Sequence, residues 1–281
     1  MQTQEELKEL VRKKYNEIAL QDKRTNESSC CGSGGRSTEV YTIMSDDYTQ
    51  LKGYHTDADL GLGCGLPTEF AKIKKGDVVI HLGSGAGNDA FIARAETGEN
   101  GKVIGVDFTD AMIGKAIANA DKLSFHNVEF RLGDIEKMPV SENTGDVVIS
   151  NCVLNLVPNK MGVMKEIYRV LKPGGHFSIS DIVLKGSLPS PIKEAAEMYA
   201  GCVSGAIQKQ DYLQLIEVNG FKNITVQKEK PIIIPDDVLS GYLSAGQIVQ
   251  FRNSQTGIYS ITVFAQKPLD ENACCAPGCC Q

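Results

Sequence analysis

The sequence contains no tryptophan, few aromatic residues and no long apolar run. Aromatic residues make up only 6% of the 281 residues. No stretch reaches the roughly 18 apolar residues that a membrane-spanning helix needs, and the charged N-terminal segment lacks the apolar core of a signal peptide. We therefore expect a cytoplasmic protein with no membrane partner.

Basic residues are not in excess either. The 29 Lys and Arg residues are outnumbered by 35 Asp and Glu residues, which gives a formal net charge of −6 at pH 7. Proteins that bind nucleic acid usually carry a basic stripe or patch, so we expect no nucleic-acid partner. The hydrophobic content of 42% is sufficient for the core of one large α/β domain with additions.

Cysteine, by contrast, is abundant. Disulfides rarely persist in a reducing compartment, so nine cysteines favour metal binding or redox chemistry over a structural role. Five are dispersed and four crowd the terminal "CCAPGCC". The dispersed ones are Cys30, Cys31, Cys64, Cys152 and Cys202, and the terminal ones are Cys274, Cys275, Cys279 and Cys280.

Residues 74–184 alternate short apolar runs with helical patterns. The runs at 77–83, 102–107, 128–134, 145–151 and 176–184 predict strands, and the patterns at 88–96, 109–123 and 160–172 predict helices. Such alternation implies βαβ crossovers, and hence an α/β fold with a doubly wound, mostly parallel sheet. The turn "LKPGG" at 171–175 should connect the last of these helices to the fifth strand.

The rest of the chain is expected to be arranged around this core. Residues 5–20 have the apolar spacing of an amphipathic helix. We divide the chain into an N-terminal helix and Cys-containing loop (1–50), a ligand-binding core (51–185), a C-terminal α+β portion that completes the sheet (186–268) and a flexible Cys-rich tail (269–281).

A glycine-rich loop follows the first predicted strand in "HLGSGAGND". Ligands of open parallel sheets bind at the carboxyl ends of the strands, and glycines let the backbone approach them closely. The spacing G-x-G-x-G differs from the dinucleotide fingerprint, so we expect a ligand without a pyrophosphate. By itself, the loop also fits a glycine turn that serves packing only.

Other motifs give this loop a context. Asp107 ends the second strand 20 residues after Gly87, at the offset where an acidic side chain meets ribose hydroxyls, and "LGD" places Asp134 after the third strand. With "LKPGG", the order of these motifs over roughly residues 74–184 resembles the class I S-adenosylmethionine-dependent methyltransferases.

This resemblance implies S-adenosylmethionine as cofactor and no structural metal. It assigns the methionine end of the cofactor to the glycine loop, the ribose to Asp107, and the adenine to Met112, Asp134 and Ile135, although Met112 and Asp134 also fit a core residue and a turn residue. The cofactor-binding residues it implies are Gly83, Ser84, Gly85, Gly87, Asn88, Asp107, Met112, Asp134, Ile135 and Asn151. His81 departs from the pattern, because this family usually has an acidic residue there; a packed core histidine is the alternative.

Three cysteine motifs narrow the resemblance. "GLGCGLP", "SNCVLNLVPNK" and "AGCVSGA" together resemble the arsenite S-adenosylmethionine methyltransferases over roughly residues 50–210. That family implies that the thiolates of Cys64, Cys152 and Cys202 bind trivalent arsenic, with Cys31 or its neighbour Cys30 as a further catalytic cysteine. Soft metalloids prefer sulfur ligands, which accords with this assignment.

The chemistry implied is methylation of arsenite for detoxification. The lone pair of thiolate-bound arsenic attacks the sulfonium methyl group, so no general base is needed. Arsenic then returns to the trivalent state as two cysteines, Cys64 with Cys31 or Cys30, form a disulfide. Thioredoxin or glutathione is the reductant implied.

Two alternatives remain open from the sequence. One is a methyltransferase for a quinone-like or sterol-like substrate with the cysteines in its core, and the other is a non-catalytic arsenic-binding protein. The cysteine-rich tail fits arsenite delivery, disulfide relay or a dispensable metal-binding segment, and its doublets lack the spacing of a zinc site.

Overall fold

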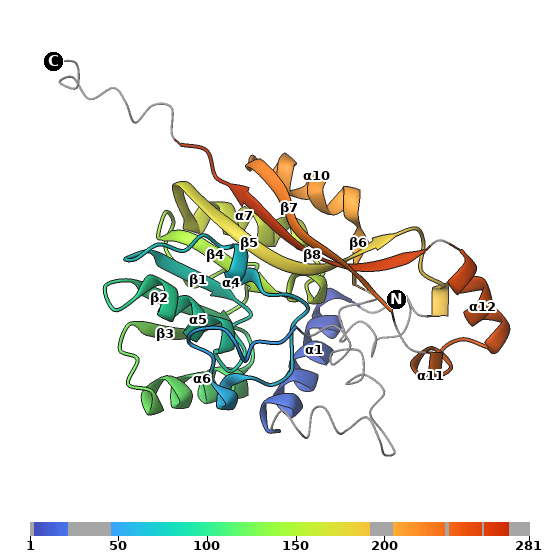
Figure 1. The fold of residues 1–281 in the computed structure, drawn as a ribbon, viewed down its shortest axis with the longest axis horizontal. Helices are drawn as coiled ribbons and strands as arrows, with labels where there is room; N and C mark the ends of the chain where they lie inside the picture. Colours follow the sequence, from blue (N-terminus) through green and yellow to red (C-terminus); the bar gives the residue numbers. More distant parts are fainter. Residues whose placement is uncertain (1–2, 22–45, 192–204, 234–235, 255, 270–281) are drawn as a thin grey trace.

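The computed structural model describes residues 3–21, 46–191, 205–233, 236–254 and 256–269. One twisted sheet forms its centre, and helices cover both faces (Figure 1). The strands are β1 (Val78–Leu82), β2 (Lys102–Asp107), β3 (Val128–Leu132), β4 (Gly145–Asn151), β5 (Leu171–Lys185), β6 (Ile207–Gln208), β7 (Lys222–Ile232) and β8 (Gly257–Gln266).

The helices of the core follow the strands in alternation. They are α5 (Asn88–Thr97), α6 (Asp110–Lys122), α7 (Lys160–Val170) and α10 (Lys209–Val218). Peripheral to them are α1 (Gln4–Ala19), α4 (Pro67–Phe70), α11 (Asp236–Leu239), α12 (Ala245–Asn253) and the 3-10 turns η2 (Thr56–Ala58) and η3 (Leu154–Leu156).

The strand order is β3-β2-β1-β4-β5-β8-β7, with the short β6 paired to β5. The pairs from β3 through β5 are parallel, whereas β8 is antiparallel to both β5 and β7. The order reverses between β1 and β4, which is the switch point where open parallel sheets bind ligands. The predicted doubly wound, mostly parallel fold is confirmed.

Both faces of the central strands are buried. In β4, Val147 and Ile149 pack with Ala90 of α5 on one side of the sheet, and Val148 packs with Ile167 of α7 on the other. A strand buried on both faces has apolar residues at successive positions rather than in alternation, and this explains the continuous run "VVI".

The "LKPGG" segment differs from the predicted turn. It belongs to β5, which begins at Leu171, directly after α7. The register moves from the pair Gly145–Leu171 to the pair Val147–His176, so β5 accommodates three extra residues in a bulge with Gly174 at a φ of 80°. Proline and glycine here produce an irregularity within the paired strand rather than a separate connection.

The N-terminal helix α1 packs against α6. Thr3 and Glu6 form a capping box at its start, and the Lys115 ammonium of α6 donates to the carbonyls of Ala19 and Gln21 at its end, at 3.1 and 2.9 Å. Both ends of α1 are therefore fixed by hydrogen bonds, and its apolar side faces the body of the protein.

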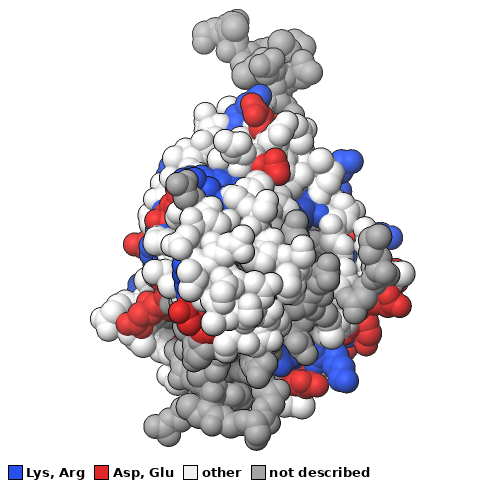
Figure 2. Space-filling view, turned by 90° about the vertical axis from the view of Figure 1, so that its right-hand side faces the viewer, with Lys and Arg blue, Asp and Glu red and all other residues white. Residues whose placement is uncertain are grey.

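Charges of both signs are mixed on the described surface. Figure 2 shows the side that lies at the right of Figure 1, where Lys and Arg alternate with Asp and Glu around a largely uncharged middle. No basic track crosses the described part of this face. Within the described ranges, no helix is long and apolar enough to span a bilayer.

Candidate active site

A cleft opens at the carboxyl ends of β1, β2 and β4. Its empty volume is about 1080 Å³, including open solvent at its mouth. The walls come from α1, residues 58–63, the β1–α5 loop, the ends of β2 and β4, and residues 107–112, 134–135 and 151–157. It therefore lies at the switch point of the sheet, where the sequence predicted a ligand loop.

The glycine loop forms the floor of this cleft. Gly83 and Gly85 have φ values of 63° and 51°, in the left-handed region that favours glycine. A Cβ on Gly83 would lie 2.3 Å from Val153 Cγ2, so this residue is also required by packing. A Cβ on Gly85 would meet no atom within 4 Å, which leaves the backbone there open to the cleft.

Asp107 lies at the end of β2 and forms a hydrogen bond with the glycine loop. Its Oδ2 accepts a hydrogen bond from the Gly85 amide and its Oδ1 one from the Thr109 amide, both at 2.9 Å. Burial raises the pKa of Asp107, and these backbone amides oppose that shift. The carboxylate lines the cleft and still has lone pairs for a hydroxyl donor.

Asp134 lies at the other end of the cleft and is paired with the N-terminal helix. Lys8 of α1 contacts Asp134 Oδ2 at 2.7 Å and Glu136 at 2.9 Å. The other carboxylate oxygen of Asp134, Oδ1, accepts a hydrogen bond from the Glu136 amide at 2.8 Å. The sequence predicted Asp134 here but gave no sign of Lys8, because their contact spans 126 positions.

Most of the other predicted cofactor residues also line the cleft. These are Ser84, Asn88, Met112, Ile135 and Asn151. Gly87 is the exception, because it precedes α5 and a Cβ there would lie 2.8 Å from the Phe91 ring. Its position is explained by packing against the first helix of the core.

His81 is buried in β1 and is one of the residues that line the cleft. Burial lowers the pKa of His81 to about 3, so the imidazole is neutral at physiological pH. Its Nδ1 has no hydrogen-bond partner among the described residues. His81 is thus a packed side chain, as the alternative interpretation expected, and it also borders the cleft.

Cys152 follows the last residue of β4 and lines the cleft. Its amide donates to the Ser180 carbonyl of β5 at 2.8 Å, and its side chain is nearly buried. The backbone has a φ of 59°, which is rare for a residue with a side chain. Such strained residues cluster at functional sites, where surrounding contacts hold them in place.

Cys64 is a fully buried thiol in the segment that precedes α4. Its amide donates to Asn151 Oδ1 at 3.0 Å, next to Cys152 in the chain, and Ser260 of β8 donates to its carbonyl. Cys64 and Cys152 belong to the same buried cluster. The structure thus brings together two cysteines that are 88 positions apart in the sequence.

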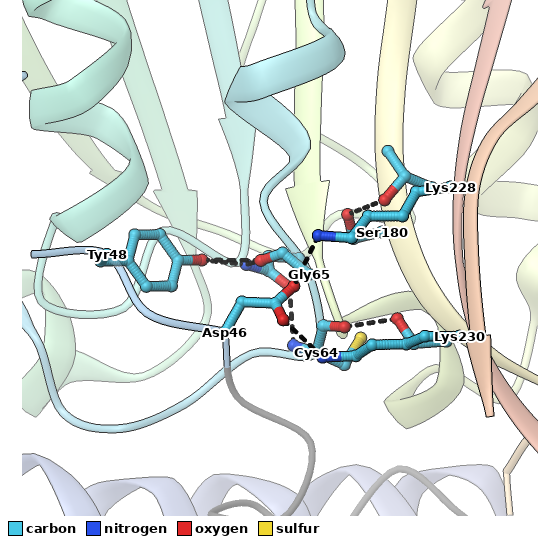
Figure 3. Close-up of polar contacts among 10 residues, drawn as sticks. Asp46, Tyr48, Cys64, Gly65, Ser180, Lys228 and Lys230 are labelled. Atoms are coloured by element: carbon cyan, nitrogen blue, oxygen red, sulfur yellow. Dashed lines mark hydrogen bonds and ion pairs between the residues drawn. The ribbon is translucent and has the colours of Figure 1, made fainter. Parts of the chain in front are cut away.

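A polar network holds the Cys64 segment against the sheet. The Tyr48 hydroxyl donates to the Gly65 carbonyl at 3.0 Å (Figure 3), and the Asn151 amide nitrogen donates to the same carbonyl at 2.9 Å. Asp46, close to Tyr48 in the chain, forms ion pairs with Lys228 and Lys230 of β7. The chain that leads into the Cys64 segment is therefore anchored to β7.

Asp89 is a site residue that sequence reasoning missed. It lies in the first turn of α5, is buried, and lines the cleft. Burial raises its pKa to about 7, while hydrogen bonds from Asn151 and Tyr48 partly oppose the shift. An acidic residue after a glycine loop is common at a helix start, and only the distant contacts reveal that this one is buried.

Several predicted residues lie outside the described ranges. These are Cys30, Cys31, Cys202 and the tail cysteines Cys274, Cys275, Cys279 and Cys280. Among the described residues, no group of three or more His, Cys, Asp or Glu side chains is placed to hold a metal ion.

Known proteins similar to this chain share its core, and the chain spans about two thirds of the length of the first two curated relatives that it matches. A family described as a methyltransferase domain matches residues 73–220. An arsenite methyltransferase of Halobacterium salinarum is 39% identical over 95% of this chain and 68% of its own length. One from Aquipseudomonas alcaligenes is 30% identical over 83% of this chain and 67% of its own length.

A solved structure shows the same relationship in three dimensions. The crystal structure of an arsenic(III) S-adenosylmethionine methyltransferase from Chlamydomonas reinhardtii superposes with a TM-score of 0.63. It is 32% identical to this chain, and the match covers 83% of this chain and 74% of that one.

Proposed function

The chain belongs to the arsenite methyltransferase family of S-adenosylmethionine-dependent enzymes, and from this premise we propose that it methylates trivalent arsenic bound to cysteine thiolates. The observation that carries the proposal is that Cys152 lines the cleft while the Cys64 amide is bonded to Asn151, the neighbour of Cys152, within the same buried cluster. Cys202 is the third ligand that the family resemblance implies.

The described residues fit the cofactor. Gly85 leaves backbone open to the cleft, and Asp107 has carboxylate lone pairs suited to ribose hydroxyls. Ser84, Asn88 and Asp89 each have a buried side-chain oxygen that lacks a hydrogen-bond partner among the described residues. Because buried polar groups are normally paired, these oxygens indicate a polar ligand. When bound, S-adenosylmethionine supplies an electrophilic methyl group on a sulfonium centre.

The chain's own residues bind and orient the substrate. Arsenite exchanges each hydroxyl for a cysteine sulfur, with one water released per As–S bond. Its remaining lone pair then forms the As–C bond as the methyl–sulfur bond breaks, and the departing thioether is neutral. Positioning can supply up to about 7–11 kcal/mol of the barrier reduction. The left-handed backbone of Cys152 and the hydrogen bond from the Cys64 amide to Asn151 set the backbone positions of two of these cysteines.

Turnover requires a reductant. Methyl transfer leaves arsenic formally pentavalent, and two thiols return it to the trivalent state by giving up two electrons and forming a disulfide. We assign this step to Cys64 with Cys31 or Cys30, and thioredoxin or glutathione then restores the thiols by exchange. The terminal cysteines are assigned arsenite delivery, with disulfide relay as the alternative.

The test uses reduced protein, arsenite and S-adenosylmethionine labelled in its methyl group. The wild-type protein should yield methylated arsenicals, and Cys152→Ser and Cys202→Ser should lose this activity. Both variants should bind S-adenosylhomocysteine within about twofold of wild type, because neither thiol is assigned to the cofactor. Normal turnover in either variant would contradict the three-thiolate site.

A second variant separates the two halves of the site. Asp107→Ala should weaken cofactor binding and leave arsenite affinity nearly unchanged. Equal loss of both affinities would contradict separate cofactor and arsenic positions. If the wild-type protein bound arsenite but no cofactor, the chain would be an arsenic-binding protein rather than an enzyme.

A further inference from the structure

Asp89 is a buried carboxylate that keeps one oxygen for a ligand. Its Oδ2 accepts a hydrogen bond from the Asn151 amide nitrogen at 3.1 Å and lies 3.3 Å from the Tyr48 hydroxyl, whose single proton it shares with the Gly65 carbonyl. Its Oδ1 is buried and has no hydrogen-bond partner among the described residues. The side chain is only 6% exposed, and it lines the cleft directly after the glycine loop.

No described cation neutralises this carboxylate. The groups that face Asp89 are the hydroxyl of Tyr48, the amide of Asn151 and, at longer range, the carboxylate of Asp59. Of the basic side chains that line the cleft among the described residues, His81 is neutral and Lys8 is paired with Asp134 and Glu136. Buried polar atoms are normally hydrogen-bonded, so the unpaired Oδ1 suits a donor that enters with a ligand.

We propose that Asp89 Oδ1 binds the α-ammonium group of the methionyl part of the cofactor. This inference rests on the proposed function, since it takes S-adenosylmethionine as the ligand of the cleft. Position 81, where the methyltransferase resemblance implies an acidic residue, carries a neutral imidazole. Asp89, in the first turn of α5, supplies the negative charge that is missing at the end of β1. Tyr48 and Asn151 contact Oδ2 of this carboxylate, so Oδ1 remains available to the ligand.

The experiment compares two ligands on two proteins by calorimetry at pH 8. S-adenosylhomocysteine carries the ammonium group, and its desamino analogue does not. In wild type, removal of the ammonium should weaken binding by about tenfold or more, as expected for a charge-assisted hydrogen bond. In Asp89→Asn, the two ligands should bind within about threefold of each other, because the charge is lost.

Asp211→Asn is the matched control. Asp211 also lies in the first turn of a helix, α10, but is exposed and remote from the cleft lining. It should retain the full wild-type preference for the ammonium-bearing ligand. If Asp89→Asn retained that preference as well, the inference would be overturned while the proposed function stood. If wild type bound neither ligand, the proposed function would fail first.

If Asp89→Asn does not fold, the proposal can be tested on the wild-type protein alone. Because burial places the pKa of Asp89 near 7, acidification neutralises it. The affinity for S-adenosylhomocysteine should therefore fall about tenfold between pH 8 and pH 6, while that for the desamino analogue changes by less than about twofold. Equal pH dependence for the two ligands would overturn the assignment of Asp89.

Discussion

Cys152 has a backbone conformation that residues other than glycine seldom adopt. Its φ of 59° occurs at the end of a buried strand, where the amide is held by Ser180. The conformation costs roughly 1–2 kcal/mol relative to a right-handed one. A small hydrophobic residue that only filled the core would not need this geometry. We therefore attribute the left-handed backbone to the position of Cys152 at the cleft.

This strain predicts an unusual order of stability among variants. Cys152→Gly relieves the left-handed strain, whereas Cys152→Ala keeps it, so the glycine variant should be up to about 1 kcal/mol more stable to urea than the alanine variant. The same comparison at Asn223, an exposed position with a φ of 54°, calibrates the effect. A clearly more stable alanine variant at 152 would show that the backbone is not strained.

At the scale of the element, the segment from Asp59 to Leu66 determines where Cys64 lies. This segment contacts β4, β5 and β8, and at Gly65 its backbone comes very close to Ser180 of β5. A Cβ on Gly65 would lie 2.5 Å from the Ser180 hydroxyl and 2.7 Å from the Ser180 Cβ. The absence of a side chain there lets the segment come close enough for the Cys64 amide to reach Asn151.

Gly65→Ala should therefore impair the arsenic site selectively. The methyl group pushes the segment away from β5, so arsenite affinity should fall at least about tenfold, and by more than the S-adenosylhomocysteine affinity, which is affected only through the contact of Asn151 with the Gly65 carbonyl. Gly114→Ala is the matched control, because Gly114 is an exposed position in α6 with no atom near its added Cβ. That variant should gain up to about 1 kcal/mol of stability, with unchanged arsenite binding.

The helix α1 is a second element with a role at the cleft. Lys8, Val11 and Tyr15 line it, and Lys8 ties the helix to Asp134 and Glu136. Lys8→Glu should replace attraction with repulsion and release the helix, which hydrogen exchange of the α1 amides would detect as faster exchange. Lys13→Glu, an exposed change on the same helix, should leave exchange unaltered. Equal exchange in both variants would contradict this anchoring role.

At the scale of the whole molecule, buried carboxyl groups control the dependence of stability on pH. Burial raises the pKa values of Asp89 and Asp181 to about 7. Between pH 4 and 7 the folded protein keeps protons on these groups that the unfolded chain has lost, so stability falls as pH rises through this window. Hydrogen bonds from Arg131 and Lys102 lower the pKa of Glu129 to about 2, and its contribution is lost as pH falls toward 2.

The reduced apoprotein should thus be more resistant to urea at pH 5 than at pH 8. Asp181→Asn should reduce that difference, because it removes one ionisation; the buried Tyr212 hydroxyl can still donate to the amide oxygen. Asp211→Asn serves again as the exposed control. A free energy of unfolding that rises from pH 5 to pH 8 in wild type would contradict the account of the buried carboxyl groups.

Local patterns predicted much of this fold, and distant contacts explain what they missed. The runs around Ile80 and Val148 predicted buried parallel strands because both faces of the sheet are covered. Gly83 and Asp107 were predictable from the order of strand and loop. Asp89 was not, because its burial depends on Tyr48 and Asn151, which are 41 and 62 positions away.

The central claim is that arsenic is bound by Cys64, Cys152 and Cys202 beside the cofactor cleft. X-ray absorption at the arsenic edge tests it, with one equivalent of arsenite bound to reduced protein in which the four cysteines beyond residue 269 are replaced by serine. This protein should show three sulfur neighbours per arsenic, and an added Cys152→Ser change should leave two sulfurs and one oxygen. Three sulfurs retained after that change would contradict the account.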